Sequence, residues 1–125
     1  MRVLLAEDNL VNQKLASTLL RKVECIVDVA HNGLEAVMLF QSNRYDAILM
    51  DCQMPEMDGF EATTAIRRLE QGRKRTFIAA MTANALDGDR ERCLHVGMDD
   101  YITKPVRPAV LEGVLRRCAQ QDSGV

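Results

Sequence analysis

Ala47-Ile48-Leu49-Met50-Asp51 decides the fold, because four apolar residues run without interruption into a carboxylate. An unbroken apolar run of this length is typical of a central strand that is buried on both faces of a parallel sheet. Three more short apolar runs end in polar groups in the same way, at Glu7-Asp8, at Thr82 and at Lys104-Pro105. The carboxyl ends of parallel strands meet at one edge of a sheet, where open α/β folds place their functional sites. We therefore expect these polar groups to converge.

The rest of the chain predicts a single α/β domain. Five strand-like runs alternate with five helix-like segments, the pattern of a parallel sheet covered by helices on both faces. The strands are expected at residues 2–6, 25–30, 47–51, 77–82 and 101–103, with residues 25–30 at an edge. The first helix carries apolar residues at fourfold spacing, which predicts one apolar face: Val11, Leu15, Leu19 and Val23. The fourth helix begins with the polar residues 87–92, so we expect it to be only marginally stable.

Composition excludes several classes of protein. The chain has 125 residues, of which 47% are hydrophobic, enough for one domain with a substantial core. A net charge of −2 with interspersed signs argues against a nucleic-acid or membrane surface. No apolar run approaches the roughly 20 residues of a membrane span, and no signal-like segment is present. The four cysteines are scattered without a CxxC motif, so we expect reduced cytosolic thiols and no zinc site, with Cys52 as a small core residue.

The charges at the predicted edge favour a bound divalent cation. Two carboxylates about 4 Å apart repel each other by roughly 4 kcal/mol at an effective dielectric constant of about 20. Glu7, Asp8 and Asp51 together with Lys104 leave a formal charge of −2, which one divalent cation neutralises. Because all the candidate ligands are oxygen atoms, the ion expected is Mg²⁺ or Mn²⁺.

A carboxylate beside such a cation can act as a nucleophile and form an aspartyl phosphate. Asp51 is the best candidate, because it ends the central strand of the predicted sheet. Glu7 and Asp8 would hold the metal. Lys104 would stabilise the charge on the oxygens of the phosphoryl group in transit, and the Thr82 hydroxyl would donate a hydrogen bond to them.

Four stretches of this sequence match the motifs of a known family and together span residues 2 to about 118: AEDNLVNQ (6–13), MDCQMPEMDG (50–59), MTANA (81–85) and GMDDYITKP (97–105). In them the chain resembles the receiver domain of two-component response regulators, and most of all the receivers of hybrid sensor histidine kinases. The resemblance implies a flavodoxin-like fold with strand order 2-1-3-4-5. The receiver would occupy residues 1–121, and residues 122–125 would form a frayed tail or linker.

The resemblance also implies which residues accept the phosphoryl group and hold the metal. Asp51 would take it from a phosphohistidine on a histidine kinase or a histidine phosphotransfer domain. Magnesium would be bound by Glu7, Asp8, Asp51 and the backbone carbonyl of Gln53. Lys104 would bind the phosphate.

Further roles follow from the same resemblance. Thr82 and Tyr101 would form a switch pair, and Gln53 and Asn84 would tune the attack of water on the acyl phosphate. The bond between Lys104 and Pro105 would be cis, which is otherwise the state of only about 5–6% of such bonds.

The function implied is that of a phosphorylation-dependent switch. Phosphorylation would change the surface of the fourth helix, fifth strand and fifth helix, where an output partner would dock. The domain would catalyse its own phosphorylation and dephosphorylation weakly. We expect a cytoplasmic receiver excised from a longer hybrid sensor, which as a whole would be a membrane-bound histidine kinase, although a stand-alone regulator stays open.

Other functions would need residues that this sequence lacks, or would not need phosphorylation. A phosphatase of the dehalogenase type needs a second Asp two residues after the nucleophile, and position 53 is Gln. A flavin or nucleotide binder would need a phosphate-cradling loop, and neither GxGxxG nor GxxxxGK[ST] occurs. A phosphorylation-independent interaction module stays open as the alternative.

Overall fold

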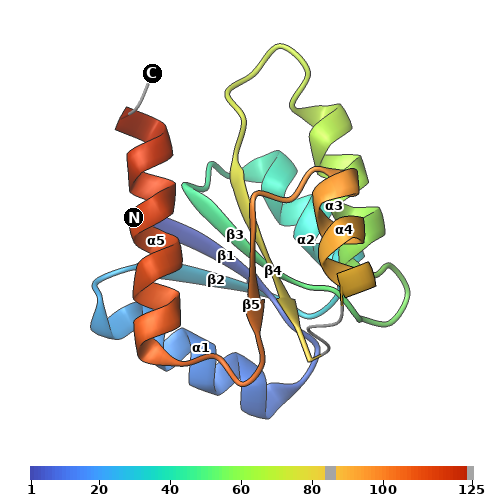
Figure 1. Ribbon diagram of the computed structural model, residues 1–125. Helices are drawn as coiled ribbons and strands as arrows, with labels where there is room; N and C mark the ends of the chain where they lie inside the picture. The colour runs from blue at the N-terminus through green and yellow to red at the C-terminus, as the bar shows by residue number, and fades with distance from the viewer. Residues whose placement is uncertain (84–86, 124–125) are drawn as a thin grey trace.

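The computed structural model describes residues 1–83 and 87–123, except for the side chains of residues 87–89, 122 and 123. Its five strands form one parallel sheet in the order β2-β1-β3-β4-β5, with helices on both faces (Figure 1). The strands are β1 (Arg2–Ala6), β2 (Ile26–Ala30), β3 (Ala47–Asp51), β4 (Phe77–Thr82) and β5 (Asp100–Thr103). The helices are α1 (Leu10–Lys22), α2 (Gly33–Ser42), α3 (Gly59–Leu69), α4 (Asp87–Val96) and α5 (Pro108–Ser123). The predicted fold class, strand order and edge position of β2 are confirmed.

Alternating residues of the central strands build two separate cores. Leu5 of β1 and Leu49 of β3 point into the core beneath α1 and α5. Leu4 and Ile48 point into the opposite core, which α2, α3 and α4 cover. Every residue of β3 is buried, as the unbroken apolar run predicted for a central strand.

The predicted apolar face of α1 is wrong except at Leu19, which is partly buried against the core. Val11 is 75% exposed and Leu15 is 40% exposed. The buried positions of this helix are Gln13, Ala16, Ser17 and Leu20. A step of four residues turns an α-helix by about 400°, so a stripe of fourfold spacing rotates by about 40° at each step and leaves the face. The positions that contact the sheet instead follow the mixed spacing of three and four.

The helices that follow β1, β2 and the loop after β3 begin at capping residues. Asn9 accepts a hydrogen bond from the Asn12 backbone N–H (3.0 Å), and Asn32 caps α2 in the same way. Asp58 and Glu61 form a capping box at the start of α3. These caps fix where each helix begins, and therefore how the preceding loop leaves the sheet.

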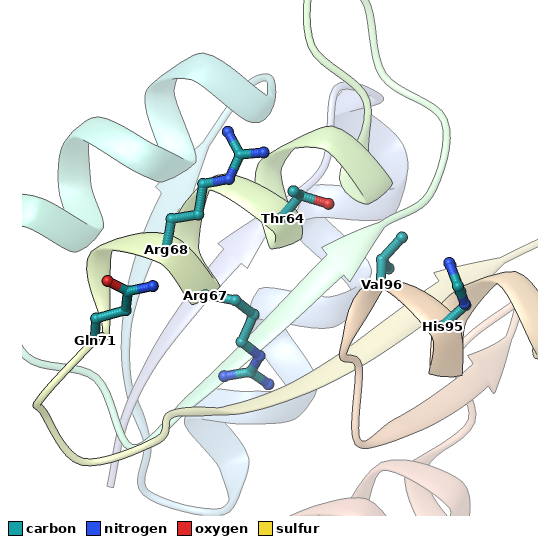
Figure 2. A pocket seen from close by; sticks show the side chains of 6 residues that line it. All are labelled: Thr64, Arg67, Arg68, Gln71, His95 and Val96. Carbon is teal, nitrogen blue, oxygen red and sulfur yellow. The ribbon is translucent and has the colours of Figure 1, made fainter.

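A polar network joins α3 to the segment between α4 and β5. The Arg67 guanidinium donates hydrogen bonds to the backbone oxygens of Gly97 (2.9 Å) and Thr76 (2.8 Å). It also pairs with Glu70 (2.6 Å) and Asp99 (2.9 Å), whose side chains are almost fully buried. Figure 2 shows the Arg67 side chain extending from α3 toward the start of β4. The network holds the carboxyl end of α4 against the sheet.

Both ends of the described chain lie near the amino ends of the strands. The Met1 backbone oxygen accepts a hydrogen bond from the N–H of Ile26, the first residue of β2 (2.9 Å). Near the other end, the Cys118 thiol donates to the backbone oxygen of Asp46, directly before β3 (3.3 Å). Among the described residues, no helix is both long enough and apolar enough to cross a membrane.

Candidate functional site

Three carboxylates meet at the carboxyl edge of the sheet. Glu7 and Asp8 directly follow β1, and Asp51 is the last residue of β3. Each contributes an oxygen to a group whose members all lie within 4.8 Å of one another. β1 and β3 are paired in parallel, which brings their ends together. The convergence predicted from the sequence is therefore confirmed for these three residues.

Lys104 connects two of these carboxylates. Its ammonium nitrogen Nζ lies 2.8 Å from Glu7 Oε1 and 2.9 Å from Asp51 Oδ2. Its backbone N–H donates to the backbone oxygen of Thr82 (2.7 Å), which places Lys104 beside the end of β4. The Lys104–Pro105 peptide bond is cis, as the family resemblance implied.

The electrostatics of the site reflect burial and the crowding of charge. The Glu7 side chain is buried, with 1% of it exposed. Burial, and after it the nearby Asp51 carboxyl, raises the pKa of Glu7, although the bond to Lys104 acts in the opposite direction. Burial alone would lower the pKa of Lys104, but its bonds to Glu7 and Asp51 outweigh burial and raise it. The ammonium therefore stays charged, and it offsets only part of the negative charge.

The donor set fits a small, hard divalent cation. All three candidate side chains offer carboxylate oxygens, the ligands that Mg²⁺ prefers, and neither sulfur nor imidazole belongs to the cluster. Glu7 and Asp51 are buried, whereas Asp8 is exposed, so the cluster has an open side. Mg²⁺ usually keeps several water ligands, which such an open side can accommodate.

The other predicted site residues have separate positions. The backbone N–H of Gln53 donates to Asp51 Oδ1 (3.2 Å), while its side chain is exposed. Thr82 is buried at the end of β4, in register with Thr103 of β5. Tyr101 is partly buried, and the Arg90 guanidinium carbon lies 5.5 Å from the centre of its ring. Asn84 lies outside the described residues.

Several residues that support the site were missed by sequence reasoning. The Gln13 side chain donates to the Glu7 backbone oxygen (2.6 Å), and the Asn9 N–H donates to Glu7 Oε2 (3.3 Å). A correctly placed buried face of α1 would have singled out Gln13. A Cβ atom added to Gly59 would lie 2.2 Å from the Asp51 backbone oxygen. That close approach depends on the fold and leaves no signal in the sequence.

A hollow of about 410 Å³ lies elsewhere, between α3 and α4 (Figure 2). None of the acidic cluster lines it, and its polar walls include Arg67, Arg68 and His95. It is therefore separate from the cluster and its chemistry.

Comparisons with known proteins agree with this geometry. The family model of the response regulator receiver domain matches residues 3–116. The chain is 51% identical over 116 residues to hybrid signal transduction histidine kinase B of Dictyostelium discoideum, an alignment that covers 85% of this chain and 6% of that protein. Hybrid signal transduction histidine kinase I of the same organism is 44% identical over 120 residues, which cover 91% of this chain and 7% of that protein. The chain thus corresponds to a small part of these relatives.

Solved structures give the same result. The receiver domain of sensor histidine kinase PA1611 from Pseudomonas aeruginosa, with a magnesium ion coordinated in its active site cleft, is 48% identical with a TM-score of 0.85, covering 93% of this chain and 94% of that one. A co-crystal structure of the Saccharomyces cerevisiae histidine phosphotransfer signaling protein Ypd1 and the receiver domain of its downstream response regulator Ssk1 matches at 32% identity and a TM-score of 0.90, covering 97% of this chain and 90% of that one. The chain belongs to the receiver domain family of two-component response regulators.

Proposed function

We propose that this receiver domain is a phosphorylation-dependent switch in which Asp51 accepts a phosphoryl group from a phosphohistidine. The single observation that carries the proposal is the position of Asp51. Its carboxylate is buried at the end of β3, lies within the acidic cluster and bonds to Lys104. The Asp51 carboxylate, which is the proposed nucleophile, thus lies beside the positive charge of Lys104 and among the candidate metal ligands.

The transfer is a displacement at phosphorus. An Asp51 carboxylate oxygen forms a bond to phosphorus as the bond from phosphorus to the donor imidazole nitrogen breaks. Lys104, already within hydrogen-bond distance of Asp51, contacts the transferred group and balances its charge. The Gln53 N–H holds the other Asp51 oxygen and so orients the carboxylate. We assign the Thr82 hydroxyl as a donor to the phosphoryl oxygens.

Glu7, Asp8, Asp51 and the backbone carbonyl of Gln53 are the proposed ligands of Mg²⁺, and Mn²⁺ would suit the same oxygen donors. When bound, the cation neutralises the clustered carboxylates and the charge of the incoming phosphoryl group. Glu7 is held for this role by Lys104 and by the Asn9 N–H.

The response to phosphorylation is assigned to Thr82 and Tyr101. Phosphorylation converts the Asp51 carboxylate into a dianionic acyl phosphate. The Thr82 hydroxyl is drawn toward this phosphate, which frees space for the partly buried Tyr101 ring. The surface formed by α4, β5 and α5 then changes and presents itself to an output partner. Gln53 and Asn84 would set the rate of hydrolysis, so the domain acts as a weak phosphatase of itself.

The proposed donor is a histidine kinase or a histidine phosphotransfer domain. Support comes from the similarity to receivers of hybrid kinases and to the receiver solved with Ypd1. In a hybrid kinase the longer protein would carry the kinase activity. The four cysteines are present as thiols, which favours a reducing compartment, so we place the domain in the cytoplasm.

Acetyl phosphate with Mg²⁺ tests the proposal directly. Intact-mass spectrometry of the wild type should show a gain of about 80 Da, which hydroxylamine removes because acyl phosphates are labile. Asp51→Asn should show no gain, and the matched variant Glu112→Gln, at an exposed position of α5, should behave as the wild type. An unmodified wild type would instead support the phosphorylation-independent interaction module.

A further inference from the structure

We propose that Cys52 and Cys93 form a redox modification site, in which hydrogen peroxide converts the two thiols into an intramolecular disulfide. The two residues are 41 positions apart in the chain, and their sulfur atoms lie 3.9 Å from each other. Both are 2% exposed. Cys52 directly follows Asp51, and Cys93 belongs to α4.

Neighbouring contacts fix the two segments that carry these thiols. Cys52 donates its N–H to the Met81 oxygen (3.0 Å) and accepts from the Gly59 N–H (3.1 Å), so it is fixed between β4 and α3. On the other side, Arg92 lies over the ring of Phe60 at 4.0 Å, which keeps this part of α4 against α3. A disulfide requires a sulfur separation of about 2.05 Å, so the thiols must approach by about 2 Å.

The other two cysteines are separated from this pair by the sheet. Cys52 and Cys93 belong to the core beneath α2, α3 and α4, whereas Cys25 and Cys118 belong to the core beneath α1 and α5. A disulfide between the two pairs would require unfolding. In the native protein, Cys52 and Cys93 are therefore the partners for each other.

The chemistry balances with peroxide as the oxidant. One thiol gives up its proton, and the thiolate sulfur attacks one oxygen of hydrogen peroxide. The O–O bond breaks, the sulfur becomes a sulfenic acid, and the leaving hydroxide takes up the proton to form water. The second thiol, likewise as its thiolate, attacks the sulfenic sulfur, the S–O bond breaks, and the hydroxide leaves with the second proton as water while the disulfide forms. Two thiols are oxidised by two electrons in total, and one peroxide molecule is reduced. A thiol reductant reverses the modification.

The bond would tie α4 to the residue after Asp51. This consequence rests on the proposed function, in which the α4 surface changes after Asp51 is phosphorylated. The oxidised protein should still gain about 80 Da from acetyl phosphate. The accompanying changes in the amide NMR signals of residues 90–96 should shrink, because α4 is then covalently held.

Peroxide treatment of the folded, reduced protein tests the site. The intact mass should fall by about 2 Da, and non-reducing tryptic digestion should yield residues 45–67 linked to residues 93–116. Cys25→Ala/Cys118→Ala should form the same link, whereas Cys52→Ala/Cys93→Ala should not. The wild-type digest is decisive even if a variant folds poorly.

Two outcomes would overturn the proposal: no link between these two peptides in the wild type, or a link that forms only after urea is added. The acetyl phosphate reaction separates this failure from a failure of the proposed function. A protein that gains the phosphoryl mass but never forms the link contradicts the disulfide alone. A protein that forms the link but gains no phosphoryl mass contradicts only the phosphoacceptor role.

Discussion

Glu7 and Asp8 are neighbours in the chain, yet their carboxylates occupy opposite environments. Glu7 is buried and bonded to Lys104, while Asp8 is exposed at the open side of the acidic cluster. Removing the Glu7 charge would therefore disturb Lys104 and Asp51 at the same time. Asp8 can be changed with little structural cost, which makes it the better probe of metal binding.

Asp8→Asn should lose most of the stabilisation that Mg²⁺ gives the wild type. A ligand at 100 times its dissociation constant stabilises a protein by about 2.7 kcal/mol, and weaker binding reduces this gain. Without Mg²⁺ the variant should be at least as stable as the wild type, because one repelling charge is gone. Melting temperatures across a Mg²⁺ titration, with EDTA as the zero point, measure both effects. Equal Mg²⁺ responses of Asp8→Asn and the control Glu112→Gln would exclude Asp8 as a ligand.

Asp28 provides a prediction about pH that is independent of the acidic cluster. It accepts a hydrogen bond from the Tyr45 hydroxyl (2.7 Å) and pairs with Arg2 (2.9 Å). The Tyr45 bond, with a smaller contribution from Arg2, lowers the pKa of Asp28 despite partial burial. Burial and the neighbouring Asp28 raise the pKa of Tyr45, so the hydroxyl remains a donor.

Because the pKa of Asp28 is lowered on folding, its contribution to stability is present above its unfolded pKa of about 3.9 and is lost as the pH falls through the folded value. Asp28→Asn should therefore lower the free energy of unfolding at pH 7 by about 1 kcal/mol. The difference from the wild type should diminish below about pH 4. Urea unfolding at several pH values measures it, and a difference that does not change with pH would contradict this assignment.

At the scale of single residues, the sequence predicts the site well where position along a strand decides it. Asp51 and Glu7 could be placed because each directly follows an apolar run that is visible in the sequence. Gln13 could not, because its contact with the Glu7 backbone depends on how α1 is rotated against the sheet. The Cys52–Cys93 contact depends on the packing of α4 and has no local signal.

At the scale of elements, the loop after β3 is fixed by a close approach of backbones. The Gly59 N–H donates to the Cys52 oxygen (3.1 Å), and Gly59 has no space for a Cβ atom beside the Asp51 oxygen. The start of α3 therefore lies directly against the end of β3. A side chain at this position would have to push these two elements apart.

Gly59→Ala should destabilise the protein by about 3 kcal/mol and reduce phosphorylation of Asp51 by acetyl phosphate. The added Cβ would lie 2.2 Å from a backbone oxygen, which cannot yield as a flexible side chain would. Gly113→Ala is the matched control, because its Cβ in α5 would lie 3.6 Å from the nearest atom, the Arg117 Nη1. The control should gain up to about 1 kcal/mol from better helix propensity. Chemical denaturation of both variants decides the matter, and equal effects would refute the close-approach argument.

Helix α1 illustrates how far sequence patterns predict an element. Its existence was predictable, because possible capping residues, Asp8 and Asn9, follow a strand and precede regularly spaced apolar residues. The structure shows that Asn9 is the cap. Its buried face was not, since small and polar residues such as Ala16, Ser17 and Gln13 occupy it. Of the apolar residues that suggested a face, Val11 lies largely in solvent, whereas Leu19 is partly buried against the core.

At the scale of the whole molecule, two exposed apolar side chains lie next to the open side of the acidic cluster. Leu10 is 73% exposed and Val11 is 75% exposed, in the first turn of α1 directly after Asp8 and Asn9. A protein that delivers a phosphoryl group to Asp51 must cover this edge of the sheet. The two side chains therefore offer apolar area to such a donor.

Leu10→Ser/Val11→Ser should slow phosphotransfer from a phosphorylated histidine phosphotransfer protein by about tenfold or more. Labelling by acetyl phosphate and thermal stability should remain as in the wild type, because both residues are exposed. Met38→Ser is the matched control, since Met38 of α2 is likewise an exposed apolar side chain, with 65% of it exposed. Rates of transfer from a donor found by screening against the wild type provide the measurement. A loss of acetyl phosphate labelling in the double variant would show that its defect is not one of docking.

The fold as a whole was predictable because each strand is visible as a short apolar run in the sequence. The hydrogen bonds and ion pairs that connect the elements were not predictable. The Arg67 network connects α3, β4 and the start of β5 through residues that are far apart in the sequence. Nothing in the local sequence distinguishes Arg67 from its neighbour Arg68, which is exposed. Such ties exist only once the chain has folded.

The placement of the two chain ends has a consequence for larger architectures. Met1 and the last turns of α5 both lie at the amino edge of the sheet, away from Asp51 (Figure 1). A module tethered to either end would emerge behind the domain and leave its reactive face unobstructed. A domain of this kind can thus form a small part of a much longer protein, as the matching segments of its relatives do, with its acidic cluster still accessible.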